Sequence, residues 1–89
     1  MDQTVQLKGM DQGHDITLVI TQAPSNCRLQ FRHAGDTTWA TYPDFSGVAT
    51  GGVLVETFLC VSAEMRIVFD TVPSSNVFIS TVVAAKATF

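Results

Sequence analysis

The feature that most constrains this chain is a regular alternation of apolar and polar residues, broken by turn residues about every eight to twelve positions. The clearest case is residues 27–32, where Cys27, Leu29 and Phe31 alternate with polar side chains. Such alternation is typical of a strand with one buried face and one wet face. No run has the length and spacing of an amphipathic helix, so the pattern predicts an all-β chain.

Further segments alternate in the same way, and each predicts a row of side chains that point into a core. The rows are Val5 and Leu7; Ile16, Leu18 and Ile20; Trp39 and Thr41; Val53, Val55, Thr57 and Leu59; Met65, Ile67 and Phe69; and Val77, Ile79 and Thr81. Turn residues such as those at 51–52 and 73–76 separate these segments. Seven or eight short strands in 89 residues leave only hairpin-length connections. We therefore expect residues 1–89 to form a single small antiparallel β-sandwich or jelly-roll-like domain.

Charge is scarce in this sequence. The chain is 46% hydrophobic and 15% charged, whereas soluble domains carry roughly 25% charged residues. We interpret the shortfall as surface that partners cover. Five Lys and Arg against eight Asp and Glu give a net charge of −3, which repels phosphate backbones, so no nucleic-acid partner is expected. The longest apolar stretch is shorter than the roughly 20 residues of a membrane span, and the first residues lack a signal-peptide pattern. We therefore expect synthesis in a cytosol and no membrane partner.

The C-terminal segment, residues 77–89, departs from the wet-face pattern because Lys86 is its only charged residue, whereas the earlier strands are expected to keep a wet face. After Thr81 the alternation breaks down and both faces become apolar. A strand that is apolar on both faces is usually buried on both, either beneath a covering loop or against a neighbouring subunit. The second explanation is favoured, and it places four residues at the subunit interface of a homo-oligomer: Val82, Val83, Ala85 and Phe89.

No group of residues predicts catalysis. The chain has no Gly-x-Ser-x-Gly elbow. His14 lies in a predicted turn and His33 at the end of a predicted strand, and both are expected to be surface histidines. The acidic residues are spread singly through turns and strand edges, so no carboxylate pair faces across a groove. The sequence therefore predicts a protein that is not an enzyme and that needs no cofactor.

No metal site is predicted either. Asp11 and Asp15 flank Gly13 as in a fragment of a calcium loop, but Gln22 stands where the bidentate Glu of such a loop would be, which favours a plain hairpin turn. Cys27 and Cys60 lie far apart, without the paired spacing of zinc ligands. Two buried thiols are the favoured interpretation, and a disulfide across the sandwich is the alternative.

Two aromatic residues raise the alternative of a carbohydrate- or receptor-binding module. Trp39 and Tyr42 are possible glycan contacts, because an exposed aromatic ring can stack on a sugar ring. On one straight strand the two side chains would point to opposite faces, unless Pro43 bends the chain. A core position for Trp39 is the favoured interpretation, with its indole N–H bonded at the sandwich edge.

Three runs of the sequence resemble the small β-sandwich virion accessory proteins of tailed bacteriophages. They are LQFRHAGDTTW at residues 29–39, EMRIVFD at 64–70 and SSNVFIS at 74–80, and together they span over half of the chain. The turn inside the first run, at residues 34–36, is Ala-Gly-Asp here, where the family commonly has Asp-Gly.

The resemblance implies a capsid decoration (cement) protein, or a tail or fibre module, located in the virion. Such a protein acts by binding the major capsid protein or another virion protein and by associating with itself, with a trimer favoured. Arg28 and Arg32, on the polar face of the third strand, are the expected partner contacts, and a solvated face is the alternative.

Overall fold

A computed structural model describes residues 3–8 and 12–83 of the chain, and over these residues the structure is built from strands and contains no helix. The seven strands are β1 (Thr4–Leu7), β2 (Asp15–Thr21), β3 (Cys27–Arg32), β4 (Ala40–Thr41), β5 (Leu54–Leu59), β6 (Glu64–Phe69) and β7 (Phe78–Val83). The predicted all-β fold class is therefore confirmed. Over the described ranges there is also no helix that could cross a membrane.

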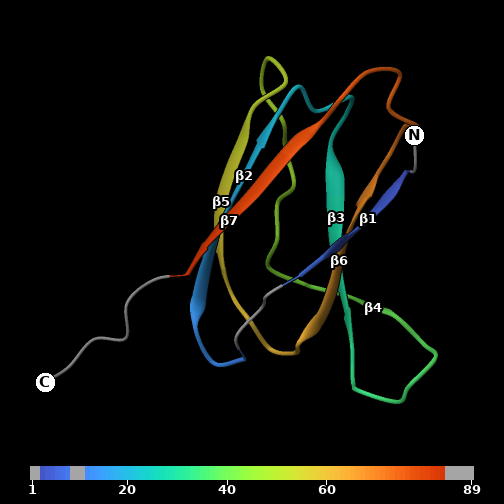
Figure 1. Cartoon of the computed structure of the whole chain (residues 1–89), viewed down its shortest axis with the longest axis vertical. Coiled ribbons are helices and arrows are strands. Elements are labelled where there is room, and N and C mark those ends of the chain that lie inside the picture. Colours follow the sequence, from blue (N-terminus) through green and yellow to red (C-terminus); the bar gives the residue numbers. More distant parts are fainter. Residues whose placement is uncertain (1–2, 9–11, 84–89) are drawn as a thin grey trace, which may run out of the picture.

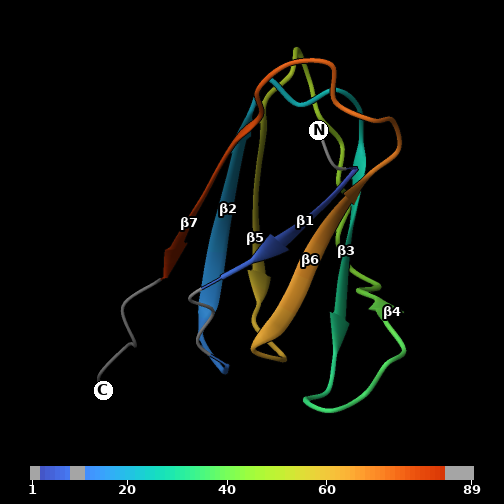
Figure 2. The ribbon, with the colours of Figure 1, turned by 45° about the vertical axis from the view of Figure 1, so that its right-hand side comes forward.

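The strands form two antiparallel sheets that pack as a small sandwich (Figure 1). One sheet has four strands in the order β1-β6-β3-β4, and the other has three in the order β5-β2-β7. Figure 2 shows the sheets as two layers, with β7 and β2 in one and β3 and β4 in the other. Each strand therefore has one face toward the partner sheet and one face toward solvent.

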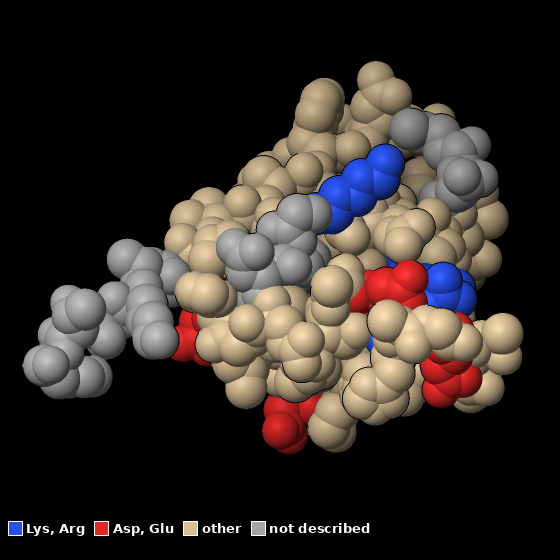
Figure 3. Space-filling model, turned by 60° about the horizontal axis from the view of Figure 1, so that its bottom comes forward, with Lys and Arg blue, Asp and Glu red and all other residues tan. Residues whose placement is uncertain are grey.

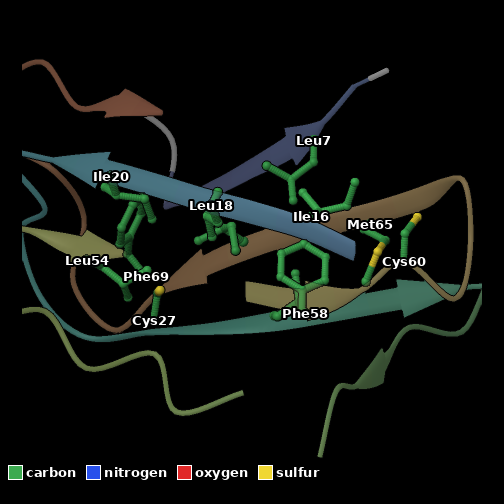
Figure 4. Close-up of a cluster of buried hydrophobic side chains, with 12 residues drawn as sticks. Leu7, Ile16, Leu18, Ile20, Cys27, Leu54, Phe58, Cys60, Met65 and Phe69 are labelled. Atoms are coloured by element: carbon green, nitrogen blue, oxygen red, sulfur yellow. The ribbon is translucent and has the colours of Figure 1, made fainter. Parts of the chain in front are cut away.

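The core lies between the two inner faces (Figure 4). It contains twelve buried side chains: Leu7, Ile16, Leu18, Ile20, Cys27, Leu29, Leu54, Phe58, Cys60, Met65, Ile67 and Phe69. Burying one Leu, Ile or Phe side chain contributes about 1.5–3 kcal/mol, so a row of such residues determines which face of a strand turns inward. The rows predicted for β2 and β6 are confirmed by the burial of these residues, and so is the β3 row, in which Phe31 is partly buried and packs against the core.

The row predicted for residues 53–59 is wrong by one position. Leu54 and Phe58 are buried, whereas Val55 is 63% exposed and Leu59 is 46% exposed. A shift of one residue turns every side chain of a strand to the other face. Phe58 fixes the observed phase because its ring makes edge contacts with Tyr42 and Phe45, at centroid distances of 6.0 Å each.

The prediction that Trp39 and Thr41 point into the core is also wrong. β4 has only two residues, and both are exposed. Trp39 precedes this strand and is half-buried outside the core. Tyr42 packs against the core in its place, where its ring lies 6.2 Å from that of Phe31 in an edge arrangement.

The segment that follows Tyr42 closes one side of the sandwich by joining β3 to β5. The Cys27 N–H donates to the Gly47 carbonyl at 2.9 Å. The Glu56 carboxylate on β5 accepts hydrogen bonds from the Ser46 N–H (2.8 Å), the Ser46 hydroxyl (2.8 Å) and the Gly47 N–H (3.1 Å). Gly47 has φ +65°, and a Cβ at this position would lie 1.8 Å from the Cys27 carbonyl oxygen. Only glycine fits this close approach.

The strands β1 and β7 form an open side of the sandwich. They are edge strands of different sheets, and side chains from both line a groove of about 270 Å³. This side has no counterpart of the Gly47 segment among the described residues. The two sheet edges are therefore separate surfaces that other groups can reach.

Candidate functional site

The outer face of the three-stranded sheet, here called the apolar face, is formed by β-branched, apolar and hydroxyl side chains. It comprises Thr17, Val19 and Thr21 from β2, Val55, Thr57 and Leu59 from β5, and Phe78, Ser80 and Val82 from β7. The registers place Val19 between Val55 and Ser80. The Thr17 and Thr57 hydroxyl oxygens are 2.9 Å apart and share a hydrogen bond.

This face is almost free of charge. Among the residues that the structure describes, its only ionisable side chain is Asp15, at one end of β2 opposite Leu59. Phe78 is 57% exposed and Val82 is 58% exposed, and both belong to the edge strand β7. Contiguous exposed apolar side chains of this kind mark interaction sites in soluble proteins.

The two edges of this sheet differ in their protection against pairing with another strand. On β5, Glu56 lies in the phase of the buried residues and is tied to the Ser46–Gly47 backbone. An inward-pointing charge and a covering loop are devices that discourage edge pairing. β7 has neither a charged residue nor a proline between Phe78 and Val83. Its second edge pairs with no other strand of the described part of the chain, so it lacks such a device there.

Half of the predicted subunit interface can be located. Val82 and Val83 are exposed at the end of β7, whereas Ala85 and Phe89 lie outside the described residues. The contribution of Val55 and Leu59 is a correction to the expectation that the earlier strands keep a wet face. The row predicted for residues 53–59 places both side chains in the core, because it is wrong by one position.

The outer face of the four-stranded sheet, here called the basic face, has the opposite character. From β1 it carries Gln6, and Lys8 follows directly after that strand. The other members are Arg28, Gln30 and Arg32 from β3, and Glu64 and Arg66 from β6. All the Lys and Arg residues of the described chain are among these, and Glu64 is the only acid in the four strands of the sheet. The net charge of the whole chain therefore conceals a local excess of positive charge. Figure 3 looks at the bottom of the molecule in Figure 1, where a few charged side chains of both signs lie among uncharged residues.

Trp39 lies across the basic face. Its ring centroid is 4.5 Å from the Arg32 guanidinium carbon and 4.2 Å from that of Arg66. The Arg32 Nε–H donates to the Glu64 carboxylate at 2.9 Å, and the Arg66 Nε–H donates to the Gln30 side-chain oxygen at 2.8 Å. These contacts hold the indole and two cations in one fixed arrangement, with each cation–π contact contributing about 0.5–1 kcal/mol at an exposed site.

This arrangement shows where the predicted site residues lie. Arg32 forms an ion pair with Glu64 of the same chain, and Arg28 is exposed on the same face. Their contact with a partner molecule stays a prediction. Trp39 and Tyr42 do not share a platform, because Tyr42 packs against Phe31 and Phe58 while Trp39 lies outside the sheet.

A groove of about 790 Å³ adjoins Trp39. Its polar and aromatic lining comes from Thr4, Gln6, Lys8, Trp39 and Arg66, and apolar side chains including Val77 and Ile79 complete it. Gln6 lies directly opposite Arg66 in the register of β1 and β6. The sequence analysis did not single out Gln6 or Arg66 as site residues. For Arg66 a signal was present, because its alternation with Met65 and Ile67 places Arg66 on the outer face of the sheet, as Arg32 is.

Both cysteines are buried thiols that do not form a disulfide with each other, and the Cys60 thiol donates to the Ser62 carbonyl at 3.1 Å, so the favoured interpretation of the pair agrees with the structure. Burial raises the pKa of Cys27 from 9.0 to about 11, and the negative charges of Glu56 and Asp70 add to this effect. Over residues 3–8 and 12–83, no group of three or more His, Cys, Asp or Glu side chains is placed to hold a metal ion.

A scan against protein-family models matches no family, and comparisons with curated proteins and with solved structures likewise find no match. The functional argument therefore depends on the two sheet faces and on the groove beside Trp39.

Proposed function

We propose that this protein is a non-enzymatic structural module that acts by assembling with copies of itself and with a larger protein surface, as a capsid decoration protein of a virion does. The observation that carries the proposal is the apolar face, which has a single ionisable residue and ends at the unprotected edge of β7. In a chain with a net charge of −3, such a face favours contact with protein. The resemblance of residues 29–80 to phage virion proteins supports the decoration role.

The contact between copies is antiparallel pairing of β7 with the β7 strand of a second molecule. A strand that pairs antiparallel with its own copy generates a twofold axis, so the contact is closed and self-complementary. The three-stranded sheet of each copy would become half of a continuous six-stranded sheet. Because the apolar face contains almost no charge, two such faces can lie side by side without repulsion. The combined apolar face is the surface that we expect to dock on the particle.

Light scattering after size exclusion tests this assembly. We expect the wild-type chain to have twice its monomer mass of 9.6 kDa. On dilution the measured mass should fall toward that of the monomer. A threefold mass would instead support the trimer implied by the resemblance, and the edge contact would then need another geometry.

The variant Val82→Lys places a charge on the outer face of β7, and we expect it to be monomeric. Val72→Lys is the matched control, because Val72 is 61% exposed but lies outside the strands. A wild-type chain that stays monomeric from micromolar to millimolar concentration would refute the self-association. Failure of labelled protein to co-sediment with tailed-phage capsids would refute the decoration role separately.

A further inference from the structure

We infer that the groove beside Trp39 is a binding site for a carboxylated sugar, such as a uronic or sialic acid unit of an anionic glycan. The polar part of the site lies on the basic face, whereas Ile79 on its apolar side belongs to β7, the strand that pairs in the proposed assembly. Its volume of about 790 Å³ is within the range of about 300–1,000 Å³ that is typical of small-molecule sites.

The charge of the lining determines the sign of the ligand. Lys8 and Arg66 line the groove, and no Asp or Glu of residues 3–8 and 12–83 does. This is unexpected in a chain with eight acids and five bases. Glu64, the nearest acid on the same strand, accepts the hydrogen bond from Arg32 and does not line the groove. Guanidinium and ammonium groups bind carboxylates through charge-assisted hydrogen bonds.

Arg66 is positioned for this role before any ligand arrives. Its Nε is bonded to Gln30, and its guanidinium carbon lies 4.2 Å from the Trp39 ring centroid. The terminal nitrogens of the guanidinium are therefore the part left to meet a ligand. A side chain that is already held in place loses less entropy on binding.

The uncharged lining favours a sugar over a bare anion. Trp39 supplies an aromatic surface, and Gln6 and Thr4 supply an amide and a hydroxyl that can bond to sugar hydroxyls. The other uncharged lining residues are apolar and can pack against the C–H face of a sugar ring. An inorganic anion would use only the two cations and would leave most of the groove empty. A nucleic acid would need a longer row of cations than the two that line this groove.

Intrinsic fluorescence reports on this site directly, because Trp39 is the only tryptophan of the chain. The probes are trigalacturonate and 3′-sialyllactose, with the methyl ester of trigalacturonate and plain lactose as uncharged counterparts. We expect a saturable change in Trp39 emission with the acidic sugars and at least tenfold weaker binding of the uncharged ones. Only one of the two acidic sugars need bind, and the one that binds identifies the sugar type.

Charge-removing variants locate the binding. Lys8→Gln and Arg66→Gln should each weaken binding about tenfold, the usual size of one lost charge-assisted contact. Arg28→Gln is the matched control, because Arg28 is exposed on the same face but does not line the groove. Lys8 follows β1 and is exposed, so its variant tests the site even if Arg66→Gln fails to fold.

Four results would overturn the assignment. The first is the absence of a saturable change with both acidic sugars, and the second is equal binding of the methyl ester or lactose. The third is an equal loss of affinity in Arg28→Gln, which would indicate general attraction to the face. The fourth is the same saturable change with inorganic sulfate or with a single-stranded oligonucleotide at matched ionic strength.

Discussion

Cys27 gives the fold a pH dependence with a defined sign. Its side chain is 4% exposed, and its pKa rises from 9.0 to about 11 on folding, chiefly through burial. Between these values the unfolded chain has lost the thiol proton while the folded chain still holds it. Stability must therefore fall as the pH rises. The contribution of the neutral thiol is complete below pH 9 and is lost as the pH approaches 11.

The size of the effect follows from the two pKa values. A shift from 9.0 to about 11 corresponds to roughly 3 kcal/mol in full, at about 1.36 kcal/mol for each pKa unit. About half of this should be lost between pH 8 and pH 10. For a domain of this size, that loss lowers the Tm by about 5–10 °C.

The measurement is urea unfolding by circular dichroism from pH 8 to pH 10, under reducing conditions, for the wild type and Cys27→Ala. The variant loses some packing energy at every pH, so its whole curve shifts downward. Only the wild type should show the additional decline from Cys27. Cys60 is present in both proteins and cancels in the difference. If the two curves run parallel across this range, the reasoning about Cys27 is wrong.

Two further predictions concern the segment that closes the sandwich. Gly47→Ala should destabilise the fold by several kcal/mol more than Gly51→Ala, because the two glycines have φ of +65° and +60° but only at Gly47 would a Cβ meet backbone. Similar losses of Tm in the two variants would contradict the close approach to Cys27. Glu56→Gln should cost about 1–3 kcal/mol, because a carboxylate that accepts three hydrogen bonds becomes an amide with one accepting oxygen. Glu64→Gln, which weakens only the exposed pair with Arg32, should cost about 0–1 kcal/mol, and equal losses in urea unfolding would show that Glu56 does not anchor the segment.

The strands that the sequence predicts correctly share one property. In β2, β3 and β6, large apolar residues occupy one phase, and charged or hydroxyl residues occupy most of the other. The difference in burial energy between the two phases is then several kcal/mol, which local pattern alone reveals. This is why Ile16, Leu29 and Ile67 could be placed in the core before any tertiary contact was known.

β5 lacks that property, since its sequence LVETFL has apolar residues in both phases. The choice between them depends on contacts that are distant in sequence: Phe58 with Phe45, and Glu56 with Ser46. A carboxylate in the inward phase argues against that phase until its hydrogen-bond donors are known. The Trp39 site also depends on contacts distant in sequence, because Trp39 meets Arg66 only when β3 pairs with β6. The local pattern could therefore not predict it.

Assembly through the apolar face would strengthen glycan binding at the groove beside Trp39. A β-sandwich places its outer faces back to back, so contact through the apolar face leaves Trp39 and Arg66 on the opposite face uncovered, although Ile79 of the pairing strand β7 also lines the groove. Each assembled copy would then present one basic face to solvent. A single site with two cations binds weakly, but sites repeated on one particle bind a polymeric glycan with much greater avidity. Val82→Lys should therefore reduce binding to immobilised polygalacturonate while leaving trigalacturonate affinity unchanged, a separation that a role confined to one face would not produce.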